Sequence, residues 1–185
     1  MSKYNLQSSF EIFNLSYGIK EIPSNAGVFI RKASKAVIRK GNKILLILTN
    51  KGDLKFPGGG HKDNESVEEC LKRELLEETG FKLKYLHNLL GRVVENNLDK
   101  YEADKYFSMQ SEYYSVEIDT TIQEKLNLDA YEKEQCFKPI FIDINEALKQ
   151  NEKIINNERE HNPWVQRETD VLKKLIQMEN RIVVL

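Results

Sequence analysis

Residues 56–81 read FPGGGHKDNESVEECLKRELLEETGF, and this stretch decides the fold. Three consecutive glycines after a proline, at 58–60, cannot lie inside a regular helix or strand, so they are expected to form a turn. The residues that follow favour a helix, with Asp63 or Asn64 as its N-cap and acidic residues in its first turn. The helix is predicted to end just before Gly80, because glycine suits the left-handed position that commonly follows a helix.

The predicted helix carries acidic residues on the face that should be apolar. At about 100° per residue, Glu74, Glu77 and Glu78 share an arc with the apolar Val67 and Leu71. An ordinary amphipathic helix would place carboxylates on the opposite face. These three also lie in the last two turns, where the helix dipole disfavours anions, and they repel one another at i,i+3 and i,i+4 spacing.

A bound divalent cation would remove these penalties together. Carboxylate oxygens without a neighbouring cluster of histidines or cysteines select Mg²⁺ or Mn²⁺ rather than zinc. The glycine turn that precedes the helix would let bare backbone groups approach a metal or a phosphate. The alternative is that the three glutamates form a solvated acidic face, and the residues alone leave both interpretations open.

The same stretch resembles the signature of the Nudix hydrolase family. From Gly59, the chain has five residues, Glu65, seven residues, and then RELLEETGF at 73–81. Every fixed polar and glycine position of the signature is present. Only Phe81 departs, because it is aromatic where the family prefers an aliphatic residue, and this change concerns packing rather than chemistry. The resemblance covers roughly residues 33–148.

The resemblance implies an α+β fold, an α/β/α sandwich with a mixed β-sheet and flanking helices. The order of apolar segments agrees with it, since strand-like runs surround the signature and include a hairpin turn at Gly41–Asn42. Further helices are predicted from Ile144 and from Asn162–Pro163. We expect an N-terminal edge extension, a Nudix hydrolase domain and a C-terminal helix packed on the same domain, at residues 1–30, 31–150 and 151–185.

The resemblance also implies an enzyme. Its members hydrolyse the diphosphate bond of a nucleoside diphosphate linked to another moiety, with Mg²⁺ or Mn²⁺ as cofactor. The substrate class stays open among dinucleotides, nucleotide sugars, ADP-ribose and nucleoside triphosphates. The alternative is a non-catalytic Nudix-fold module that binds a nucleotide as a sensor or regulator.

Carried over position by position, the resemblance assigns the metal to the acidic helix. Glu74, Glu77 and Glu78 would be ligands, and the backbone carbonyl of Gly59 or of its neighbour Gly58 would add an oxygen. The general base would be Glu74 or Glu77, or else a carboxylate of a later loop. The candidates in that loop are Glu132 and Glu134.

The remaining signature residues would position the site and the substrate. Glu65 and Arg73 would orient the loop and the helix by pairing with neighbouring carboxylates. Gly58 and Gly60 would contact the substrate through their backbone.

Composition limits the partners. The chain has 185 residues, of which 28 are Lys or Arg and 29 are Asp or Glu, for a net charge of −1. This balance gives no electrostatic basis for a dedicated nucleic-acid or membrane-surface binder. No segment approaches the ~20 apolar residues needed to cross a bilayer. We therefore expect a cytoplasmic protein with a small-molecule partner, with Cys70 and Cys136 as buried free thiols. Whether the last helix caps the sheet or joins a homodimer stays open.

Overall fold

The computed structural model describes residues 13–102, 104–157 and 161–182. Its elements, in chain order, are β1 (Phe13–Gly18), β2 (Gly27–Val37), β3 (Arg39–Lys40), β4 (Lys43–Leu48), β5 (Leu54–Lys55), α1 (Val67–Thr79), β6 (Lys82–Leu98), β7 (Lys105–Asp119), α2 (Ala130–Glu134), β8 (Lys138–Asp143), α3 (Ile144–Asn156) and α4 (Val165–Ile182).

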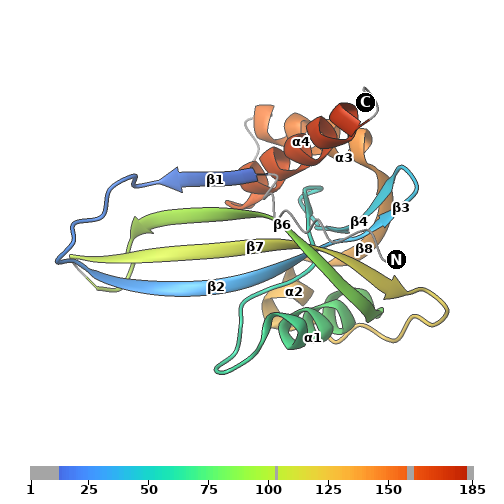
Figure 1. Ribbon diagram of the computed structural model, residues 1–185, viewed down its shortest axis with the longest axis horizontal. Helices are drawn as coiled ribbons and strands as arrows, with labels where there is room; N and C mark the ends of the chain where they lie inside the picture. Colours follow the sequence, from blue (N-terminus) through green and yellow to red (C-terminus); the bar gives the residue numbers. More distant parts are fainter. Residues whose placement is uncertain (1–12, 103, 158–160, 183–185) are drawn as a thin grey trace, which may run out of the picture.

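Two sheets carry the helices. The first has the strand order β1-β6-β7-β2, and it is mixed because β6 and β7 are antiparallel while β1–β6 and β2–β7 are parallel. In the second, β4 pairs antiparallel with β3, β5 and β8. The helix α1 lies on one side of the strands, and α3 and α4 lie on the other (Figure 1). This arrangement confirms the predicted α+β fold.

The strand β4 explains why the core has two halves. Its apolar run Ile44–Ile47 is buried throughout, as expected for a strand covered on both faces. Ile44 and Leu46 pack in the cluster that includes α3 and α4, whereas Leu45 packs in the cluster that includes α1. The predicted hairpin before this strand is confirmed, with Gly41 in a left-handed conformation between β3 and β4.

The helix α1 begins later than its sequence suggests. Its N-cap is Ser66, whose hydroxyl accepts from the backbone of Glu69 while the Glu69 carboxylate accepts from the backbone of Ser66. The prediction of Asp63 or Asn64 as the cap is therefore wrong, because this reciprocal pair satisfies the helix end and Asn64 adopts the left-handed conformation of a turn. The helix ends at Gly80 as predicted, with φ 72°.

The C-terminal helix packs into the same core, through Val171, Leu172 and Leu175. It begins at Val165 rather than at Asn162–Pro163, because the Asn162 side chain bonds Asp53 instead of the helix end. Both cysteines are free, but Cys136 is exposed rather than buried. Among the described helices, none combines the length and apolar character that a membrane crossing requires.

Candidate active site

The glycine turn is fixed by close packing. Gly58 has φ 122°, and a Cβ there would lie 2.2 Å from the Ser34 carbonyl oxygen of β2. A Cβ on Gly59 would lie 2.5 Å from Glu74 Oε1. The glycines therefore let the backbone lie directly against β2 on one side and against an acidic residue of α1 on the other.

Two acidic residues of α1 do lie on its buried face. The exposed fraction is 8% for Glu74 and 1% for Glu78, and both share this face with Leu71 and Leu75. A third acidic residue, Glu132, comes from the short helix α2. One carboxylate oxygen from each of the three glutamates lies within 4.8 Å of the others. Three carboxylates without histidine or cysteine are the donor set of a hard dication.

The carboxylate of Glu78 already has two donors. Lys55 Nζ lies 2.5 Å from Glu78 Oε1, and the Gly58 backbone N–H donates to Glu78 Oε2 at 2.8 Å. The same ammonium lies over the ring of Phe137, 4.3 Å from its centroid. The acidic helix, the glycine turn and the end of β5 therefore meet at one carboxylate.

Arg73 joins the turn to the helix. It donates to both oxygens of Glu65, at 2.7 Å and 2.8 Å, and to the Gly60 carbonyl at 3.1 Å. It also reaches Glu74 at 2.5 Å and Glu77 at 3.2 Å. These hydrogen bonds lower the pKa of Glu65 to about 2. The long guanidinium side chain thus reaches Glu74 although the two residues point about 100° apart on the helix.

Burial, together with neighbouring charges, shifts the pKa values of three groups in the site. Burial and the neighbouring Glu78 raise the pKa of Glu74. Burial, with Glu78 as a further cause, raises the pKa of Glu132 to about 7. Burial lowers the pKa of Lys35 to about 8, with Lys55 adding repulsion, and the Lys35 ammonium donates to the Gly58 carbonyl. A nearby cation would favour the charged forms of Glu74 and Glu132.

Some of the residues predicted for the site lie outside the cluster of three carboxylates. The Glu77 side chain is 31% exposed and pairs with Arg73. Glu134 is exposed, although it lies on the same short helix as Glu132. The Gly59 carbonyl accepts from the Ser34 backbone N–H at 3.1 Å, so one of its lone pairs is occupied.

A cavity of about 700 Å³ opens at the three carboxylates. Its lining includes basic side chains from three separate elements: Arg31 and Lys35 of β2, Lys55 of β5 and Arg167 of α4. It also includes the aromatic rings of Tyr101, Phe107, Tyr131, Phe137 and Trp164. The lysines and Arg167 were not among the residues predicted from sequence. Lys55 could have been found from sequence, because it is a lysine between the apolar residues Leu54 and Phe56. Arg167 could not, because only the fold brings α4 to the site.

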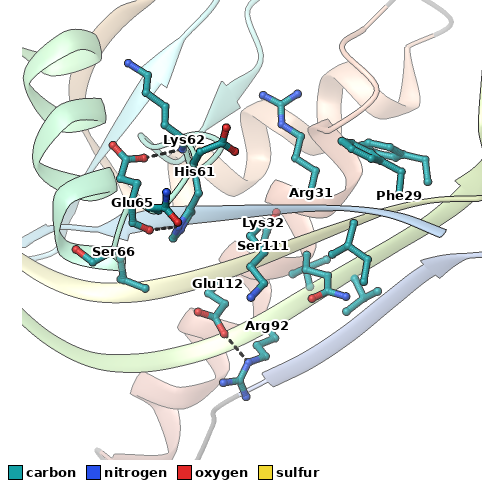
Figure 2. A pocket seen from close by; sticks show the side chains of 18 residues that line it. Phe29, Arg31, Lys32, His61, Lys62, Glu65, Ser66, Arg92, Ser111 and Glu112 are labelled. Atoms are coloured by element: carbon teal, nitrogen blue, oxygen red, sulfur yellow. Dashed lines mark hydrogen bonds and ion pairs between the residues drawn. The ribbon is translucent and has the colours of Figure 1, made fainter.

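A larger cavity, of about 1,020 Å³, adjoins this one, and Arg31 and Phe107 line both. It lies between the loop before α1 and the strands β2, β6 and β7 (Figure 2). Figure 2 shows Arg92 paired with Glu112 on its wall, at 2.8 Å. The three clustered carboxylates line the smaller cavity only, so the smaller cavity is the candidate active site.

Comparison with known proteins gives a match to one family model. The model of the NUDIX domain family matches residues 28–165, well over half of the chain. This match extends beyond residues 33–148, which the resemblance in the sequence covers. It begins in β2 and ends at the first residue of α4. A search of curated proteins finds no match.

Several solved structures are similar to this chain. A NUDIX hydrolase from Nitrosomonas europaea has 19% identity and TM-score 0.49, over 77% of this chain and 87% of that one. A mutator MutT protein from Bacillus halodurans has 21% identity and TM-score 0.47, over 65% and 72%. A MutT NUDIX hydrolase from Burkholderia pseudomallei has 20% identity and TM-score 0.42, over 63% and 85%.

Proposed function

Because the chain belongs to the Nudix family of pyrophosphohydrolases, we propose that it hydrolyses the diphosphate bond of a nucleoside diphosphate linked to another moiety, with Mg²⁺ or Mn²⁺ as cofactor. The observation that carries this proposal is the cluster of Glu74, Glu78 and Glu132 at the wall of the cavity. Two of these carboxylates are buried on the inner face of α1, where a dication would offset the cost of burying several negative charges together.

The donor set fits a hard dication, which would neutralise the diphosphate and activate a water at phosphorus. Glu74 and Glu78 would hold the ion from α1, while Arg73 keeps the glycine turn and the helix in register. Glu132 is the carboxylate from outside the signature that lies close enough to act, as a third ligand or as the acceptor of the water proton. Its neighbour Glu134 is exposed and outside the cluster.

The cavity wall supports a nucleotide as substrate. Basic groups such as Arg31 and Lys35 line it near the carboxylates and would pair with phosphate oxygens. The rings of Tyr131 and Trp164 also line it, and aromatic walls with a few polar groups are typical of sites that bind a base.

The test is a substrate panel read by chromatography of the products. Nucleoside triphosphates, ADP-ribose, dinucleoside polyphosphates and nucleotide sugars are each incubated with the protein and Mg²⁺ or Mn²⁺. We expect cleavage of at least one class within its diphosphate linkage. Glu78→Gln should lower kcat by about 10²–10³-fold. It removes a carboxylate that would hold the metal, and the metal would stabilise the negative charge that develops in the transition state.

The matched control is Glu68→Gln, because Glu68 lies on the exposed face of the same helix and pairs with Lys72. This variant should keep wild-type turnover. Folded wild-type protein that binds nucleotides but cleaves none of the panel with either metal would contradict hydrolysis. That result would instead favour a binding module.

A further inference from the structure

Lys55 pairs with Glu78, one of the three carboxylates of the proposed metal site. Its ammonium bonds Glu78 Oε1 at 2.5 Å, and the exposed fractions of the two side chains are only 11% and 1%. The other oxygen of Glu78 accepts from the Gly58 N–H. Both oxygens of Glu78 are therefore engaged by donors within the chain.

Packing alone does not explain a buried ammonium at this position. Lys55 lies between Leu54 and Phe56, which are both fully buried, so an apolar side chain would suit this segment. Burying a charge is costly unless it is paired, and the Lys55 pair is with a carboxylate of the metal cluster. The lysine therefore supplies a positive charge where three carboxylates converge.

The same ammonium and a dication would compete for the negative charge of Glu78. A metal held by Glu74, Glu78 and Glu132 would lie a few ångströms from Lys55 Nζ, in a buried place where water screens repulsion poorly. Two features give the displaced ammonium another position. The face of Phe137 lies next to it, and the cavity for the substrate phosphates opens beside it.

We propose that Lys55 is an internal cation that occupies Glu78 until a divalent metal displaces it, and that the released ammonium then binds a phosphate of the substrate. This inference rests on the proposed function and deepens it. It assigns Lys55 two successive partners, first Glu78 and then a phosphate oxygen. Lys35 Nζ donates one hydrogen to the Gly58 carbonyl and so helps to position the glycine turn.

The test measures Mn²⁺ binding without substrate, from the electron paramagnetic resonance signal of free Mn²⁺ at pH 8. Lys55→Met removes the competing charge and keeps the volume of the side chain. We expect it to bind Mn²⁺ about tenfold more tightly than wild type, the lower end of what close charge pairs contribute. With a substrate found in the panel, the same variant should show a higher KM.

Lys72→Met is the matched control, since Lys72 forms a comparable 2.6 Å pair with Glu68 on the exposed face of α1. It should leave Mn²⁺ affinity unchanged. Should Lys55→Met fail to fold, lysine-selective NMR of wild-type protein replaces it. Mg²⁺ must then shift the Lys55 signal, assigned through Lys55→Arg, and must leave that of Lys72 in place.

Folded Lys55→Met that binds Mn²⁺ no more tightly than wild type overturns the inference, as does an unmoved Lys55 signal. If wild-type protein still binds Mn²⁺ and cleaves diphosphates, only the role of Lys55 is lost. If wild-type protein binds no Mn²⁺ and cleaves nothing, the proposed function is lost with it.

Discussion

Arg73 shows how much one residue organises here. Its guanidinium donates to Glu65 and the Gly60 carbonyl in the loop before α1. It also donates to Glu74 and Glu77 of α1, so it links the loop to the acidic part of the helix. Five donors in a planar fork allow such a set of partners, whereas a lysine would supply one point charge. The bidentate pair with Glu65 can be tested through the pH dependence of the free energy of unfolding.

We predict that Glu65→Gln lowers the free energy of unfolding by about 2 kcal/mol at pH 7, as expected for hydrogen bonds to a charged group. The folded pKa of Glu65 is about 2, below its ordinary value of 4.5. The stabilisation is therefore complete above about pH 4.5 and is lost as the pH falls toward 2. Urea denaturation between pH 7 and pH 3 measures it.

In that experiment the difference in the free energy of unfolding between wild type and Glu65→Gln should become smaller below pH 4.5. Glu68→Gln, on the exposed face of the same helix, should differ little from wild type at any pH. A difference that stays constant down to pH 3 would contradict the pairing with Arg73.

At the scale of elements, the glycine turn and α1 form one unit. The turn follows β5, lies against Glu74 and Glu78 of α1, and is joined to β2 by a backbone hydrogen bond from the His61 N–H to the Lys32 carbonyl. The positions of the carboxylates therefore depend on a backbone that carries no Cβ at 58–60.

We predict that Gly59→Ala weakens Mn²⁺ binding by about 10- to 100-fold, the range for groups that orient metal ligands. Gly59 lies outside the left-handed φ range, so alanine causes no backbone strain there, and the three atoms nearest to its Cβ would all belong to the Glu74 carboxylate. The melting temperature should change little, because the obstacle is the end of a flexible side chain. Calorimetric titration with Mn²⁺ measures the loss.

Gly27→Ala is the control, since Gly27 also lies outside the left-handed φ range and a Cβ there would make ordinary contacts with the Lys105 side chain. Its Mn²⁺ affinity should equal that of wild type. Wild-type affinity in Gly59→Ala would show that Glu74 does not bind the ion.

At the scale of the whole molecule, the C-terminal helix is tied to the site through the core. Glu168 of α4 is fully buried and accepts from the Phe56 N–H at 3.0 Å, just before the glycine turn. It also holds Arg167, which reaches Glu95 on β6. Strands, turn and helix therefore support the site as one body, and a ligand at the site should stabilise all of it.

We predict that Mg²⁺ raises the melting temperature. A ligand that binds only the folded state at 100 times its Kd adds about 2.7 kcal/mol to the free energy of unfolding. Calorimetry with and without millimolar Mg²⁺ measures the shift, and Glu78→Gln should abolish it. An equal shift in wild type and Glu78→Gln would place the ion elsewhere.

The sequence alone determined the features that depend on neighbours in the chain. The glycine turn, the helix after it, its end at Gly80 and the acidic residues on its inner face follow from sterics and from a period of 3.6 residues. The predicted N-cap was wrong because several polar residues compete before Val67, and the pair of Ser66 with Glu69 satisfies the helix end best.

Only the tertiary structure decided which distant groups meet. Glu132 joins the cluster while Glu134, two residues away, is exposed, and this depends on how the short helix α2 packs. Lys55 and Arg167 enter the cavity from β5 and α4. A buried charge is costly unless it is paired, so these residues are paired with groups from other segments. The sequence of one segment does not show which group another segment will place beside it.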